Sequence, residues 1–91
     1  MSLFITRVEL HNGEQDYDAL HRAMAAEKFS RTILYYGVTY HLPTAEYSST
    51  AADANIVLQA ARRAVAATRK TAGILVTLSS LTVPDGLPVV R

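Results

Sequence analysis

The sequence contains no cysteine and no tryptophan, and neither sign of charge dominates it. Without a thiol there is no disulfide framework and no cysteine nucleophile or metal ligand, which fits a reducing compartment. No apolar run approaches the roughly 20 residues of a membrane-spanning helix, and the first residues lack the pattern of a signal peptide. Nine basic and eight acidic residues give a net charge of +1, so no overall field attracts nucleic acid. These absences predict a cytoplasmic protein with no membrane partner.

The composition is that of a folded domain. Of the 91 residues, 49% are hydrophobic and 19% are charged, which is too apolar for a disordered chain. This length suits a single small core. We expect one domain over residues 1–80 and a C-terminal tail over residues 81–91, which forms either an extra strand or a dimer contact.

The clearest local pattern is a β-hairpin over residues 29–42. Residues 29–33 and 38–42 alternate between apolar and polar side chains, as strands do. Residues 34–37 are short enough for the loop, and Gly37 can adopt the positive φ that hairpin turns require. Pro43 lacks an N–H group and should end the second strand.

One strand and one helix are predicted on each side of this hairpin. The strands are residues 2–10, with Phe4, Thr6, Val8 and Leu10 toward the core, and residues 74–78. One helix is predicted over residues 14–28. The other should begin at a capping box formed by Thr50 and Asp53 and end at Gly73. Residues 43–49 should form a connector with an exposed Tyr47.

The resulting order is βαββαβ, which predicts an α+β fold of the ferredoxin-like type. Right-handed crossovers would place both helices on one face of a four-stranded antiparallel sheet. Leu3 and Ile5 would then lie on the open face of that sheet, together with Arg7 and His41.

Several segments resemble the GhoS-type antitoxin family, formerly a family of unknown function. They are FITRVELH (residues 4–11), YDALH (17–21), FSRTI (29–33) and TYHLPTAEY (39–47), and the resemblance extends over residues 3–77. Members of the family are small ferredoxin-like proteins, similar in fold to the CRISPR-associated small nucleases. The best-known member is an endoribonuclease that silences a toxin by cutting its messenger RNA. The resemblance therefore implies an RNA-acting protein in a toxin–antitoxin system.

The chain departs from those nucleases at the end of its first strand. They carry an aspartate there, whereas this chain has Glu9, Leu10, His11 and Asn12. Without a pair of aspartates to hold Mg²⁺, no metal site and no cofactor are predicted. Any cleavage of RNA should then proceed without a metal ion.

The candidate catalytic residues are His41 and Arg7 on the open sheet face. His41 would deprotonate a ribose 2′-hydroxyl, and Arg7 would stabilise the charge that develops on the phosphorus centre. Tyr35 and Tyr36 at the hairpin tip would stack on the bases of single-stranded RNA or, equally, pack against a dimer partner. Arg31 would bind RNA as well, although it alternates with Phe29 and Ile33 and so could instead flank the core.

A second interpretation involves no catalysis. His11 and His21 fit a turn and a helix flank, and no Ser-His-Asp order or Gly-rich phosphate loop is present. An open sheet face with Leu3 and Ile5, next to an apolar tail, is typical of a surface that dimerisation covers. The alternative function is therefore a homodimeric interaction or structural module.

Overall fold

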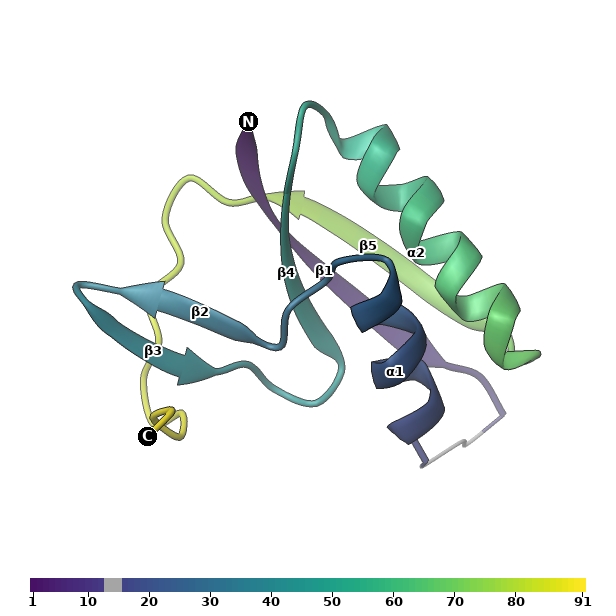
Figure 1. The fold of residues 1–91 in the computed structure, drawn as a ribbon, viewed down its shortest axis with the longest axis horizontal. Coiled ribbons are helices and arrows are strands. Elements are labelled where there is room, and N and C mark those ends of the chain that lie inside the picture. The colour runs from purple at the N-terminus through teal and green to yellow at the C-terminus, as the bar shows by residue number, and fades with distance from the viewer. Residues whose placement is uncertain (13–15) are drawn as a thin grey trace.

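The computed structural model describes residues 1–12 and 16–91. Figure 1 shows its helices and strands. In chain order they are β1 (Ser2–Leu10), α1 (Asp18–Ala26), β2 (Thr32–Tyr35), β3 (Val38–His41), β4 (Glu46–Ala51), α2 (Ala54–Thr68) and β5 (Ala72–Leu78). Among the described residues, no helix is both long and apolar enough to cross a membrane.

Three strands form an antiparallel sheet with β1 at its centre. The order is β4-β1-β5, and Arg7 of β1 lies between Glu46 of β4 and Leu75 of β5. Burial alternates along β1, with Phe4, Thr6, Val8 and Leu10 facing the core. This confirms the face assignment that the sequence pattern predicted for the first strand.

The hairpin forms a second sheet, so the predicted single four-stranded sheet is wrong. Strands β2 and β3 pair only with each other as named strands, and one isolated bridge, Ser30 to Ser48, joins the approach to β2 with β4. Strand β3 ends at His41, just before the stop predicted at Pro43, which has no N–H group for a ladder. A turn follows, in which the Glu46 amide donates to the Pro43 carbonyl at 2.9 Å. The chain therefore leaves β3 and starts β4 in the other sheet.

The hairpin turn is tighter than the sequence indicated. Leu34 and Tyr35 pair with Thr39 and Val38, which leaves only Tyr36 and Gly37 in the loop. Their φ angles are 46° and 76°, and two central residues with positive φ define a type I′ turn. The expectation for Gly37 is confirmed, while the predicted four-residue loop is two residues too long.

The tail returns to the hairpin. Val89 bridges Tyr40, the His41 amide donates to the Pro88 carbonyl at 2.8 Å, and the Val90 amide donates to the Thr39 carbonyl at 2.9 Å. Strand β3 therefore has β2 on one side and residues 88–90 on the other.

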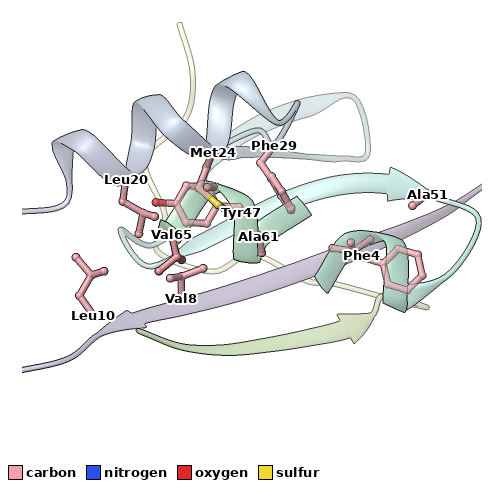
Figure 2. Packing of buried hydrophobic residues seen from close by; sticks show 12 residues of the cluster. Phe4, Val8, Leu10, Leu20, Met24, Phe29, Tyr47, Ala51, Ala61 and Val65 are labelled. Atoms are coloured by element: carbon pink, nitrogen blue, oxygen red, sulfur yellow. The ribbon is translucent and has the colours of Figure 1, made fainter. Parts of the chain in front are cut away.

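Both helices pack on the buried face of β1. Leu20 and Met24 of α1 and Ala61 and Val65 of α2 join Val8 in one core (Figure 2). The other buried members are Phe4, Leu10, Phe29, Tyr47, Ala51, Val57 and Ala64. The small alanine side chains let α2 approach both α1 and the sheet closely. Leu20 and Met24, and Ala61 and Val65, are spaced as residues on one face of a helix, so each helix buries one apolar stripe.

The helix ends differ from the prediction. Thr50 lies in β4, and Asp53 alone caps α2, because its Oδ1 accepts the Ile56 amide at 3.1 Å. Arg69, with a φ of 61°, takes the left-handed position at the C-terminal end, whereas Gly73 lies in β5. Helix α1 begins at Asp18, and the predicted start at residue 14 lies outside the described residues.

Candidate functional site

The hairpin tip presents two tyrosine rings. The ring centroids of Tyr35 and Tyr36 are 4.6 Å apart, and the rings meet edge to face at 83°. Tyr36 is 89% exposed and the neighbouring Leu34 is 69% exposed. Figure 1 shows this turn at the end of the hairpin that points away from both helices. An exposed ring that is held by a second ring offers a π-face on which a nucleic-acid base can stack.

Arg7 lies on the open face of the three-stranded sheet. Its Nη1 atom is 3.7 Å from Oε2 of Glu46, its neighbour on β4, and more than half of its side chain is exposed. An exposed ion pair of this kind contributes little to stability. The guanidinium can therefore exchange Glu46 for another anion at low cost.

His41 is the last residue of β3 and is exposed. It pairs with Thr32 in the two-stranded sheet, and its backbone is held by the tail. No Cα atom of β3 lies within 8 Å of a Cα atom of β1. The structure thus places His41 and Arg7 on different sheets rather than side by side on one.

Arg31 lies at the base of the hairpin, next to a tyrosine that sequence analysis did not select. The Ser30–Ser48 bridge brings the segment of Arg31 beside β4, and the positive charge of Arg31 acts on the side chains of both Tyr47 and His21. Tyr47 is fully buried, contrary to the exposed connector that we predicted. The reason is that residues 46–51 form a strand that packs between β1 and the approach to β2.

The hydroxyl group of Tyr47 contacts a histidine of α1. The distance from its Oη atom to Nδ1 of His21 is 2.7 Å. The His21 ring also lies near Tyr17, with centroids 6.2 Å apart. We call His21, Tyr47 and Arg31 the His–Tyr–Arg cluster. Its members come from α1, β4 and the segment before β2.

The surroundings keep both aromatic members neutral. Burial, helped by the positive charge of Arg31, lowers the pKa of His21 below its ordinary 6.5, and the Asp18 carboxylate opposes the shift. Burial raises the pKa of Tyr47 to about 12; the Arg31 charge opposes this rise and Tyr17 adds to it. At neutral pH the Tyr47 hydroxyl therefore keeps its proton; because Nδ1 of the uncharged His21 is the partner of this fully buried hydroxyl, we assign the Tyr47 proton to that hydrogen bond. That leaves the hydrogen of the imidazole on Nε2.

Two further features carry less chemistry. A hollow of ≈ 330 Å³ lies between the end of α1, β4 and α2, and it is lined mainly by small and apolar side chains. Its acid, Glu27, is already bound to Arg63 at 3.0 Å. Within residues 1–12 and 16–91, no group of three or more histidine and acidic side chains is arranged to hold a metal ion.

The sequence pattern contained one signal for this cluster. Tyr47 and Ala51 have the even spacing of residues on one face of a strand, and both are buried in β4. No pattern links His21 to a residue 26 positions later, because only the packing of α1 on β4 brings them together.

Comparison with known proteins gives no match: no protein-family model, no curated protein and no solved structure is significantly similar to the chain. The resemblance to GhoS-type antitoxins therefore stays a prediction from the sequence.

Proposed function

We propose that this protein binds single-stranded RNA through its β2–β3 hairpin, as a cytoplasmic antitoxin of the GhoS type would. The observation that carries the proposal is the exposed Tyr36 ring, braced by Tyr35 at the end of the hairpin. Sequence-specific recognition of RNA favours unpaired bases that stack on aromatic side chains. The net charge is nearly zero, so the stacking surface and a few local arginines have to supply the affinity.

The strand order supports the ferredoxin-like part of this proposal. The three-stranded order β5-β1-β4, continued by the Ser30–Ser48 bridge, follows the neighbour relations of a split βαβ fold. In this view the chain bends at Arg31, directly after the Ser30–Ser48 bridge, and β2 and β3 then pair with each other rather than with β4. That bend turns the hairpin into a projecting arm.

Cleavage of the bound RNA is the second step of the proposal. We assign the general base to His41, the exposed histidine at the base of the hairpin; Arg7 lies on the other sheet and has no part in this step. Proton abstraction by an imidazole requires no metal ion. Cleavage should therefore persist in EDTA in the wild-type protein and be lost in His41→Ala.

The test of RNA binding is a titration of a fluorescent single-stranded RNA at two salt concentrations. Tyr36→Ala should weaken binding by about 1–3 kcal/mol, the range for losing one base–aromatic stack. Leu34→Ala is the matched control, since it truncates an exposed apolar side chain on the same hairpin without removing a ring. Equal affinities for the two variants, or no binding by the wild type, would contradict the proposal.

A second candidate function is a homodimeric interaction module without catalysis. Strand β5 is the outer strand of its sheet and carries no charge and no proline, the features that usually prevent strands from pairing with another chain. Leu75 is 63% exposed and Leu78 is 57% exposed. An antiparallel pairing of two β5 strands would join two copies into one continuous sheet.

A further inference from the structure

We infer that Arg31 and His21 form a binding site for one phosphate group at the base of the hairpin, and that Tyr47 positions His21 for this contact. The inference rests on the proposed RNA function and deepens it, because it specifies where the backbone of the RNA strand is held. None of the three residues acts in the proposed cleavage step.

The first argument is the availability of Arg31. Its side chain is exposed, and within the described part of the chain it forms neither an ion pair nor a hydrogen bond. A planar guanidinium presents several N–H donors that match the oxygens of a phosphate. Arg7 and Arg63, by contrast, already have carboxylate partners.

The second argument is the orientation of the His21 ring. With the proton of the buried Tyr47 hydroxyl assigned to Nδ1, the neutral ring offers Nε2–H as a donor. His21 is only half-buried, whereas Tyr47 beneath it has no exposed surface. Tyr47 thus fixes the tautomer from inside the core, in the way that buried partners orient a functional imidazole.

The third argument concerns the groups that surround the site. Asp18 on α1 and Arg31 both act on His21, with opposite signs, and Tyr17 lies beside the same ring. Asp18 is exposed, so water screens its repulsion of an anion. The Arg31 guanidinium and the Nε2–H group of His21 are both hydrogen-bond donors, and a phosphate oxygen is a suitable acceptor for each.

The position of the site fits the stacking surface at the tip. Arg31 and Tyr36 are five positions apart in the sequence, which corresponds to about 16 Å along an extended strand. A short oligonucleotide can therefore place a base on the Tyr36 ring and a phosphate at Arg31. The hairpin would bind the strand along its length.

The first experiment uses inorganic phosphate as the probe. Side-chain ¹⁵N spectra of the full chain should show a shift of the His21 Nε2 signal on titration. Arg31→Gln should remove that shift, whereas Arg22→Gln, which neutralises an exposed arginine of α1 next to His21, should preserve it. Tyr47→Phe should change the His21 tautomer ratio and weaken the response. An unchanged His21 signal in the wild type would overturn the inference.

The second experiment separates this site from the proposed function. With single-stranded RNA, Arg31→Gln should reduce the slope of log K against log salt by about 1, and Arg22→Gln should not. If phosphate shifts His21 but RNA does not bind, the site stands and the RNA function fails. A different outcome would refute the site and leave the RNA function standing: RNA binds through Tyr36, but Arg31→Gln changes neither the salt dependence of RNA binding nor the phosphate-induced shift of the His21 signal.

Discussion

At the scale of the residue, the contact between His21 and Tyr47 ties α1 to the central sheet. Tyr47 has no exposed surface, and its hydroxyl would be costly to bury without a partner. His21 supplies that partner, and the Tyr47 ring packs edge to face on Phe29, with centroids 6.3 Å apart. One side chain therefore joins the core, helix α1 and the entry to the hairpin.

This contact should make stability depend on pH at both ends of the range. The pKa of His21 is lowered on folding, so the unfolded chain binds the extra proton more readily. The contribution of His21 to the free energy of unfolding is complete above pH 6.5 and decreases as the pH falls below 6.5. The pKa of Tyr47 is raised from 10.0 to about 12, so the unfolded chain loses its proton first. The contribution of Tyr47 to the free energy of unfolding is complete below pH 10 and decreases as the pH rises toward 12.

The measurement is chemical denaturation of the wild type and of Tyr47→Phe across this range. Two pKa units correspond to roughly 2–3 kcal/mol, which the wild type should lose between pH 10 and 12 in excess of the variant. On the acid side, His21→Gln should flatten the decrease below pH 6.5. Parallel curves for the wild type and both variants would show that the two groups do not titrate as argued.

At the scale of the element, single residues decide where segments end. Pro43 separates β3 from β4, Asp53 begins α2, and Arg69 ends it in the left-handed conformation. Each works locally, through a missing N–H group, a side-chain acceptor or a positive φ. The hairpin forms a separate arm because the boundary at Pro43 falls between β3 and β4.

The cap of α2 gives a prediction at this scale. Asp53→Ala removes the acceptor for the Ile56 amide and should lower the free energy of unfolding by about 0.5–2 kcal/mol. Asn55→Ala changes an exposed residue of the first turn that makes no capping bond and should have a much smaller effect. Thermal or urea denaturation of both variants provides the comparison, and equal losses would contradict the role of Asp53.

At the scale of the whole molecule, exposed apolar side chains gather on the outer strand and the tail. Beside Leu75 and Leu78 of β5, Leu81 is 77% exposed and Val83 is 58% exposed. Only residues 88–90 of the tail pair with the hairpin, on the side of β3. A second copy of the chain is the partner that an uncharged outer strand fits most simply.

We therefore expect a homodimer. Sedimentation at micromolar concentration should give about twice the chain mass of 9.9 kDa. Leu75→Lys places a charge in the middle of β5 and should shift the equilibrium toward the monomer, while Leu34→Lys, an equally exposed position on the other sheet, should not. A wild-type protein that sediments only as a 9.9 kDa species would refute the dimer.

Much of the fold followed from local pattern. The alternation in β1, the helical stripes through Leu20 and Ala61, and the positive φ at Gly37 each depend on residues close together in the sequence. Such features have a short-range physical cause: the period of a strand, the period of a helix, or the steric freedom of glycine. The sequence by itself therefore determined the α+β class and which faces are buried.

The tertiary structure decided how these pieces pair. Residues 43–49 were predicted to be a connector, whereas residues 46–51 form a strand that pairs with β1, and this pairing buries Tyr47. The same packing brought His21, Tyr47 and Arg31 together and put His41 and Arg7 on separate sheets. A contact between distant residues, such as His21 and Tyr47 at 26 positions apart, depends on the registry of whole elements, and no pattern in a single segment encodes that registry.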